Sequence, residues 1–367
     1  MFDRRLLQSF NWPLLLVTLV LAFIGVLTLF SAVEPGGDDL TRVLCIKQLI
    51  WLGIAAVVMI CTFLIHYNLF DRYGFFIWLA AVLLLAWVLL FGRVISGSQR
   101  WLHIGPLSFQ PSEFAKIAIM IMLARHFSRA ASEKGLVLRD LGKPLLWLGV
   151  PCALILRQPD LGTTILICLI AGTMTMFMKI RRRSLLYLVT FGLAAVPSVW
   201  FSLKEYQKER IFTFLNPDRD PLGAGYHIIQ SKIAIGSGML TGKGYMQGTQ
   251  KSLSFLPEQH TDFIFSVLAE EWGFVGSGVL LLMFMLLIVW GLGVAYRSKD
   301  PFGAVLAVGV VSMIFWQVFI NIGMVMGLMP VVGVPLPLVS YGGSSVLTTM
   351  VGIGILLNIS MRRFLFE

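Results

Sequence analysis

The residues from Phe302 to Met361 contain no Asp, Glu, Lys, Arg or His. A soluble domain usually has about 25% charged residues, and a lipid solvent explains why the charge is missing here. A membrane helix needs about 20 mostly apolar residues, which makes the stretch too long for one span. Its Pro- and Gly-rich centre, from Met329 to Gly343, divides it into two. The stretch therefore predicts a chain that crosses a lipid bilayer more than once.

The rest of the chain extends the same pattern. It is 57% hydrophobic and 13% charged over 367 residues, with a mean hydropathy of +0.83. We predict an all-α integral membrane protein forming a single polytopic domain over residues 1–367. About ten transmembrane helices are expected, with a large extracytoplasmic loop at about 204–263 between spans seven and eight. The predicted spans are about 11–33, 48–70, 73–92, 108–127, 143–157, 160–179, 184–203, 264–296, 302–327 and 340–361.

The distribution of Lys and Arg predicts the orientation. Sixteen lie in the short connections on one side of the predicted spans, and six in those on the other side. Because positive residues collect in cytoplasmic loops, both termini are expected to be cytoplasmic and the long loop to face outward. The same bias accounts for the net charge of +10, so no nucleic-acid partner is predicted. The four cysteines form no C-x-x-C pair and indicate no zinc or redox site.

The fourth predicted span carries charge into the bilayer. Glu113 and Lys116 stand three residues apart and so share one helical face. Unpaired charge at the centre of a membrane helix costs about 2.5–3.5 kcal/mol per residue on insertion scales, and mutual pairing reduces that cost. Two interpretations stay open: an ion pair that only holds helices together, and the polar wall of a functional cavity.

Two short loops offer further polar candidates. Arg100 begins a Gly- and Pro-containing loop before the fourth span, and it could contact an anionic head group or simply be solvated. Asp160, which follows Pro159, could cap the next helix or face an outer cavity.

The long outward loop is the most informative region. Residues 228–235 predict a short, partly apolar helix that could lie in the membrane interface. The run from Gly236 to Gly244 lacks the P-loop spacing, which rejects a nucleotide site, although its N–H groups could cradle a diphosphate. Asp262 ends the loop at the membrane boundary, where partial desolvation would make its carboxylate a better base. The alternative is an N-cap for the following helix.

These segments resemble the SEDS family (shape, elongation, division and sporulation). The matching motifs run from about residue 93 to the end of the chain and include RWLHIGPLSFQPSEFAKIA, QPDLGTT, FLPEQHTDFIFSVLAEEWG and PVVGVPLPLVSYGGSS. The resemblance implies a peptidoglycan glycosyltransferase that polymerises lipid II into β-1,4 glycan strands, for cell elongation and rod shape. It places the enzyme in the bacterial inner (cytoplasmic) membrane with its active site facing the periplasm. It also implies a class B penicillin-binding protein, a transpeptidase, as partner.

The implied reaction assigns roles to the candidate residues. Asp262 is the expected general base, which deprotonates the acceptor lipid II, while the donor is the glycan linked to undecaprenyl diphosphate. The expected substrate-binding residues are Glu113, Lys116, Arg100, Asp160, Arg210, Lys243 and His260. No cofactor is assigned. A divalent cation (Mg²⁺ or Mn²⁺) could share the stabilisation of the diphosphate, but no metal-ligand cluster is evident.

Two other functions fit parts of the pattern. Intramembrane charge and a broken helix also suit a lipid II flippase or another transporter, although the polar loop lies on one face only. A non-catalytic scaffold that recruits a transpeptidase is the third hypothesis. Substitution of Asp262 separates the three, because only an enzyme must lose polymerisation while keeping its partner.

Overall fold

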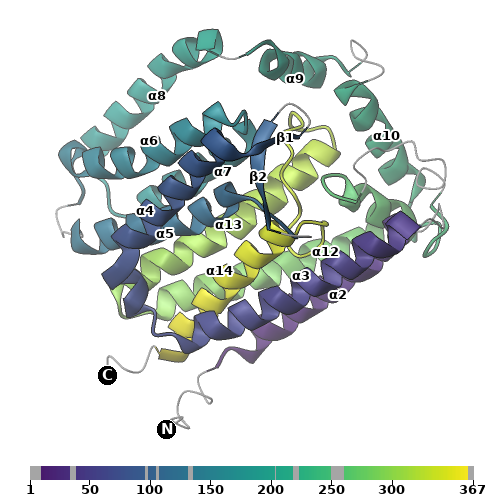
Figure 1. The fold of residues 1–367 in the computed structure, drawn as a ribbon, viewed down its shortest axis with the longest axis horizontal. Helices are drawn as coiled ribbons and strands as arrows, with labels where there is room; N and C mark the ends of the chain where they lie inside the picture. The colour runs from purple at the N-terminus through teal and green to yellow at the C-terminus, as the bar shows by residue number, and fades with distance from the viewer. Residues whose placement is uncertain are drawn as a thin grey trace.

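The computed structural model describes residues 10–33, 39–95, 98–104, 107–130, 135–202, 204–217, 223–248 and 260–362. Within them the chain is a bundle of helices with one small sheet (Figure 1). The elements are α2 (Trp12–Val33), α3 (Asp39–Leu64), α4 (Asn68–Phe91), β1 (Arg93–Ile95), β2 (Ser98–Ile104), β3 (Leu107–Phe109), α5 (Pro111–Ala130), η2 (Leu138–Leu141), α6 (Gly142–Arg157), α7 (Leu161–Phe177), α8 (Arg182–Ser202), α9 (Glu205–Leu215), α10 (Ala224–Ser237), α12 (Ile264–Arg297), α13 (Pro301–Val325) and α14 (Gly343–Arg362).

A helix lies at the position of each predicted span, but both bounds of the second are wrong: it was expected to begin at about residue 48, whereas α3 begins at Asp39. The second span was expected to run to residue 70, whereas α3 ends at Leu64. Arg362 of α14 donates to the carbonyls of Leu64 and Ile65 at 2.7 and 2.9 Å, which satisfies the end of α3. The apolar run continues past this turn into α4, so hydropathy could not locate it.

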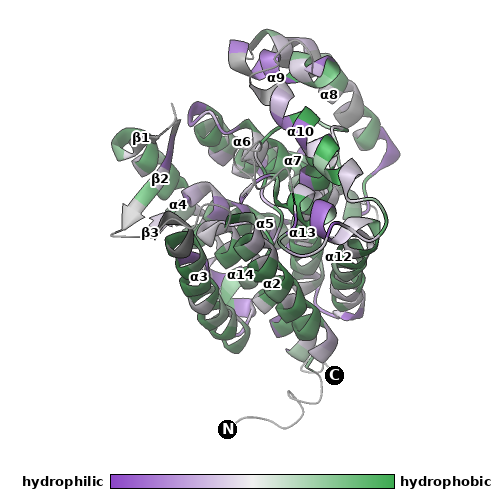
Figure 2. Cartoon of the chain, turned by 90° about the vertical axis from the view of Figure 1, so that its right-hand side faces the viewer, coloured by the Kyte–Doolittle hydropathy of each residue, from purple (hydrophilic) through white to green (hydrophobic). Residues whose placement is uncertain are grey.

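Six helices of the described chain are long and apolar enough to cross a membrane. They are α2, α3 from residue 43, α4, α12, α13 and α14. The apolar helix α7 is shorter, with 17 residues, and α5 contains Glu113 and Lys116. Apolar residues run along α2, α3, α12 and α14 (Figure 2). The chain is thus a helical membrane protein, while the full number of ten spans stays a prediction.

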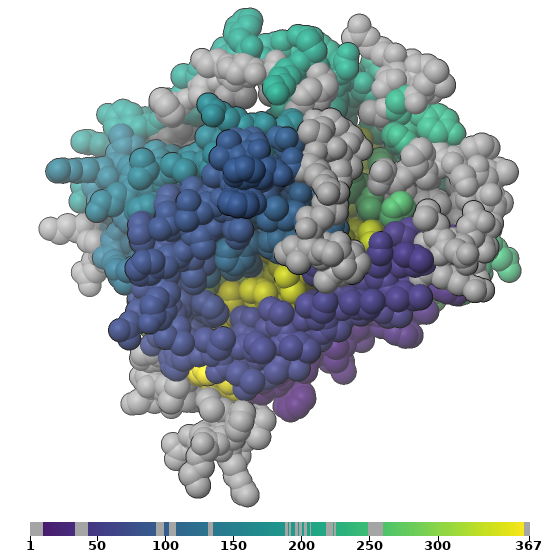
Figure 3. All heavy atoms as spheres, viewed as in Figure 1, coloured from purple at the N-terminus to yellow at the C-terminus, as the bar shows by residue number. Residues whose placement is uncertain are grey.

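The two C-terminal helices form the centre of the bundle. In their most apolar windows 89% of α14 and 78% of α13 residues are buried, against 22% for α3. α14 packs on α3, and α13 packs on α5, α7 and α12. Figure 3 shows α14 (yellow) reaching this face mainly in a strip between the residues of α3 and those that follow. The charge-free stretch is therefore buried among other helices.

The segment before α5 is a sheet, where the sequence predicted only a shaped loop. β1 and β3 each pair with β2 in antiparallel fashion, with Leu102 opposite Phe109. The all-α prediction is wrong at this point, because three short strands give too few residues for an alternating pattern to stand out from a loop. β2 contacts α4 and α5 and so places Arg100 over the start of α5.

The part of the long loop that forms α10 packs onto the bundle. α10 confirms the predicted short helix, but it lies against α12 and α13, and Ser231 Oγ donates to the carbonyl of Val325 at 2.7 Å. The Gly-rich turns after α10 meet α12 where its helical geometry breaks at Gly273, whose φ is 64°. A Cβ at Gly273 would lie 2.3 Å from the nitrogen of Gly242, so only glycine permits this contact.

Candidate functional site

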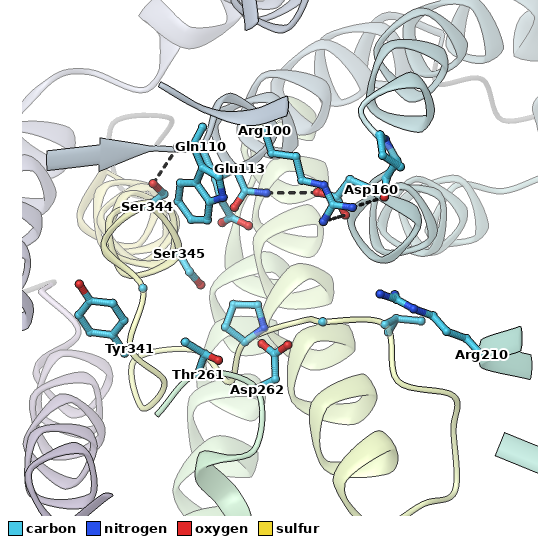
Figure 4. A pocket seen from close by; sticks show the side chains of 16 residues that line it. Arg100, Gln110, Glu113, Asp160, Arg210, Thr261, Asp262, Tyr341, Ser344 and Ser345 are labelled. Carbon is cyan, nitrogen blue, oxygen red and sulfur yellow. Dashed lines mark hydrogen bonds and ion pairs between the residues drawn. The ribbon is translucent and has the colours of Figure 1, made fainter. Parts of the chain in front are cut away.

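The described part of the chain contains a polar cavity of about 580 Å³ at one end of the bundle. Both described chain ends lie at the opposite end, since Arg362 binds the α3–α4 turn and the ring of Phe10 is 5.9 Å from that of Phe63 in the last turn of α3. The lining side chains converge from seven segments (Figure 4). The lining residues are Arg100, Trp101, Gln110, Glu113, Pro159, Asp160, Arg210, Thr261, Asp262, Val332, Gly333, Pro335, Tyr341, Gly342, Ser344 and Ser345.

Asp262 sits in this cavity on a backbone held from two sides. The carbonyl of His260 accepts from the N–H of Tyr341 at 2.9 Å, and that of Thr261 accepts from Ser340 Oγ at 2.6 Å. The carbonyl of Asp262 itself accepts from Nδ2 of Asn321, a buried residue of α13, at 2.9 Å. Three successive carbonyls are thus fixed by other parts of the fold.

Asp262 lies next to the start of α12 and also borders the cavity. The N-cap position of α12 is Phe263, whose own side chain makes no capping hydrogen bond, so Asp262 stands one residue before the cap position. Its carboxylate lines the cavity close to the backbone of Gly333, where an added Cβ would lie 3.3 Å from Oδ2. A carboxylate that faces a cavity can act on a substrate bound there.

Glu113 and Lys116 form a buried ion pair on α5. Lys116 Nζ lies 2.7 Å from Glu113 Oε1, and the two side chains are 1% and 6% exposed. Glu113 lines the cavity while Lys116 lies behind it, and Glu113 Oε2 makes no hydrogen bond in the described structure. The pair therefore combines the two open interpretations: it is buried like a structural pair, and it forms part of the cavity wall.

Asp160 also has both of its predicted roles. It is the N-cap of α7, accepting from Thr163 N at 3.1 Å, and it lines the cavity. Gln110 Nε2 donates to Asp160 Oδ2 at 3.1 Å, which ties the start of α5 to α7.

The guanidinium of Arg100 donates mainly to backbone carbonyls. Its Nε donates to the carbonyl of Gln158 at 2.9 Å and its Nη2 to that of Pro159, while Nη1 lies 3.9 Å from Asp160 Oδ1. Arg100 therefore satisfies the C-terminal end of α6 as well as facing the cavity. A bidentate contact to a head group would have to compete with these bonds.

The remaining predicted residues divide into two groups. Arg210 of α9 lines the cavity from the side opposite α5. His260 does not line it, and its ring packs 5.9 Å from that of Tyr341. Lys243 does not line it either. Its Nζ pairs with the buried Glu270 at 2.7 Å.

The glycine-rich loop around Lys243 has no free cradle at the predicted place. The N–H groups of Gly242, Lys243 and Gly244 donate to the carbonyls of Gly238, Glu270 and Glu271 at 2.8, 3.0 and 3.0 Å. The predicted diphosphate cradle in this loop is therefore wrong, since these donors already bind carbonyls of α12 and of the loop itself.

Several lining residues were not predicted as site residues. Gln110, Tyr341, Ser344 and Ser345 are uncharged, and their segments were expected to form only a loop and a helix break. The Tyr-Gly-Gly-Ser-Ser run beginning at Tyr341 was the available signal, because a polar cluster inside a charge-free stretch needs partners in a membrane.

A metal site is not supported by the described residues. No three His, Cys, Asp or Glu side chains among them come close enough to hold an ion. The predicted divalent cation consequently has no assigned ligands, and no step below depends on one.

Comparison with known proteins identifies relatives over nearly the whole chain. Residues 11–364 match the cell cycle protein family of FtsW, RodA and SpoVE. The peptidoglycan glycosyltransferase MrdB of Escherichia coli is 44% identical over 352 residues, covering 95% of this chain and 93% of that protein. The peptidoglycan glycosyltransferase RodA of Treponema pallidum is 34% identical, covering 98% of this chain and 99% of that protein.

A solved structure shares the fold. It belongs to work on the structural coordination of polymerization and crosslinking by a peptidoglycan synthase complex. Its chain superposes with a TM-score of 0.81 at 30% identity, and the match covers 97% of this chain and 98% of that one.

Proposed function

The chain belongs to the FtsW, RodA and SpoVE family and is a peptidoglycan glycosyltransferase, and we propose that the polar cavity is its active site, with Asp262 as the general base. The substrate is lipid II, and the product is a β-1,4 glycan strand for cell elongation. The observation that carries the assignment is the Asp262 carboxylate, which faces the cavity on a backbone fixed by Asn321 and Ser340.

The reaction joins a sugar 4-hydroxyl to an anomeric carbon. Asp262 takes the proton of the acceptor hydroxyl as the new C–O bond forms, and the lipid diphosphate of the donor leaves with the electron pair of the broken bond. Direct displacement converts the donor's α linkage to β and needs no covalent intermediate. A diphosphate is a good leaving group, so the second carboxylate of a glycosidase is not required.

The charged residues of the cavity have different roles in this proposal. Arg210 supplies positive charge to the lipid-linked substrate from α9. Lys116 neutralises Glu113, so that the buried carboxylate does not repel the diphosphate. Arg100 and Asp160 hold the α6–α7 connection as one wall of the cavity. We leave Lys243 and His260 out of the binding set, because neither lines the cavity.

We further propose ten spans in the bacterial inner membrane, with cytoplasmic termini and an outward-facing cavity. The bias of sixteen against six basic residues in short loops supports this orientation. So does the position of the cavity, at the end of the bundle away from both described chain ends. The described parts of the segment 204–263 then lie on the outer side.

A class B penicillin-binding protein is the proposed partner. The support is the related structure, which concerns a complex that coordinates polymerization with crosslinking. A transpeptidase domain outside the membrane would receive the strand as it leaves an outward-facing cavity.

The function is tested by purifying the wild type and Asp262→Ala with that partner and supplying lipid II. Products are resolved on a gel, and lipid II translocation is measured in vesicles in parallel. The proposal expects polymer only from the wild type, with the complex intact in both. Translocation without polymer would favour a flippase, and polymer formation unaffected by Asp262→Ala would favour a scaffold whose partner does the chemistry.

A further inference from the structure

The first turn of α14 opens into the cavity with its backbone donors unused. The first hydrogen bond of the helix joins the N–H of Val346 to the carbonyl of Gly342 at 3.0 Å. The N–H groups of Gly343, Ser344 and Ser345 have no partner among the described residues. Such groups carry roughly half a positive charge at a helix N-terminus, and here they lie within a mostly buried helix of 20 residues.

A second helix at the same cavity shows how such donors are normally satisfied. At the start of α7 the carboxylate of Asp160 accepts from Thr163 N at 3.1 Å and from Thr163 Oγ1 at 2.9 Å. The corresponding residue before α14 is Gly342, which has no side chain to accept. Among the described residues, a carboxylate thus caps α7 and none caps α14.

Ser345 adds a side-chain donor at the same place. It is only 7% exposed and lines the cavity, and its hydroxyl makes no hydrogen bond to any described residue. Its neighbour Ser344 differs, because its Oγ accepts from Gln110 N at 2.9 Å. Figure 4 shows the Ser345 hydroxyl directed into the cavity that Asp262 also faces. A hydroxyl buried this deeply without a partner points to a ligand.

The start of α14 is rigid. A Cβ on Gly343 would lie 2.1–2.3 Å from ring atoms of the buried Trp51, so glycine lets the indole of α3 pack directly on the backbone. Gly342 N donates to Gln48 Oε1 at 3.3 Å, which ties the preceding residue to the same helix. Fixed donors need no reorganisation when negative charge develops next to them.

We propose that the first turn of α14, with the Ser345 hydroxyl, binds the diphosphate of the polyprenyl-linked donor. A helix N-terminus suits phosphate because N–H groups and dipole both favour an anion. The donor is selected over the acceptor by chemistry. Only the donor's diphosphate is bonded to the anomeric carbon under attack, next to the hydroxyl that Asp262 deprotonates. As the carbon–oxygen bond breaks, its electron pair moves to the diphosphate oxygen held by α14.

This inference rests on the proposed function, and binding tests it separately. The probe is farnesyl diphosphate added to the full-length protein in nanodiscs, with farnesyl monophosphate, farnesol and inorganic pyrophosphate as comparison ligands. Ser345→Ala should weaken farnesyl diphosphate about tenfold, the loss expected for one hydrogen bond to a charged group. Ser312→Ala is the matched control, because the buried Ser312 hydroxyl already donates to Gly309 of its own helix.

A second variant guards against simple misfolding. Ser345→Asp places a carboxylate in the first turn, where it should leave the melting temperature unchanged or raise it. The same charge should weaken farnesyl diphosphate about a hundredfold or more. Stable Ser345→Asp protein with unchanged diphosphate affinity would overturn the proposal, as would equal weakening of farnesol. If the variants bind diphosphate more weakly but the wild type does not polymerise lipid II, the diphosphate site is supported and only the proposed function is wrong.

Discussion

Breaking the buried ion pair of α5 should destabilise the protein strongly, and removing both charges should not. Lys116 Nζ lies 2.7 Å from Glu113 Oε1, and Lys116 is 1% exposed. Glu113→Gln leaves the ammonium buried without its counter-ion, as Lys116→Met leaves the carboxylate. Loss of one partner of a buried pair costs about 3–5 kcal/mol, whereas replacing the whole pair by apolar groups is often neutral.

The assay is the free energy of unfolding in mixed micelles for the wild type, both single variants and Glu113→Gln/Lys116→Met. Each single variant should lose about 3 kcal/mol or more, and the double variant should recover most of it. Asp71→Asn is the control, since Asp71 pairs with Arg129 at 3.1 Å and with Arg125 at 3.7 Å, and the three side chains are 32%, 57% and 22% exposed. An exposed pair is worth about 1 kcal/mol at most.

The reasoning is refuted if Glu113→Gln unfolds like Asp71→Asn, or if the double variant is as unstable as the single ones. The double variant also addresses the pair's function. A stable double variant that no longer polymerises lipid II would show that the charges act on the substrate as well as on the fold. Full activity would reduce the pair to a structural element.

Three further outcomes are expected. Asn321→Leu should lower the polymerisation rate more than it lowers lipid II affinity, because the carbonyl of Asp262 loses its 2.9 Å donor; proportional losses in both would contradict this. Gly162→Ala should lower the free energy of unfolding by about 1–3 kcal/mol, because its Cβ would lie 2.3 Å from the carbonyl oxygen of Val332. Gly172→Ala in the same helix is the control and should leave the stability unchanged, because its Cβ would have no atom within 4 Å. The pKa of His66, in the turn between α3 and α4, is lowered from 6.5 by burial and by Arg362. Because the unfolded state then binds the proton at a higher pH than the folded state, stability should fall as the pH drops below about 6.5. If the pH dependence of the melting temperature is the same in His66→Gln as in the wild type, this reasoning is wrong.

The helices could be predicted from the sequence because the lipid solvent requires long apolar runs. Where helices end depended on tertiary contacts that no single run contains. The turn after Leu64 is satisfied by Arg362, almost three hundred residues later. The break at Gly273 exists because the turn at Gly242 packs against it.

The charged members of the site were accessible to sequence reasoning because charge in a membrane span is rare and costly. Glu113 was found in this way, whereas Asp160 and Asp262 were found where loops meet predicted spans, and the cavity brings all three together. Lys243 looked equally promising, and only the structure shows that its charge is directed to Glu270. The donors at the start of α14 carry no formal charge and belong to the backbone, so no residue count could reveal them.

The most direct test of the account compares the wild type with Asp262→Asn, each purified with its partner, for both lipid II affinity and the initial rate of polymerisation. The amide keeps the shape of the carboxylate and leaves the bonds to the carbonyls of residues 260–262 in place. The account predicts an unchanged affinity and a rate lower by about a hundredfold or more, the contribution of a general base. A rate within a few fold of the wild type would contradict the central claim that Asp262 removes the acceptor's proton.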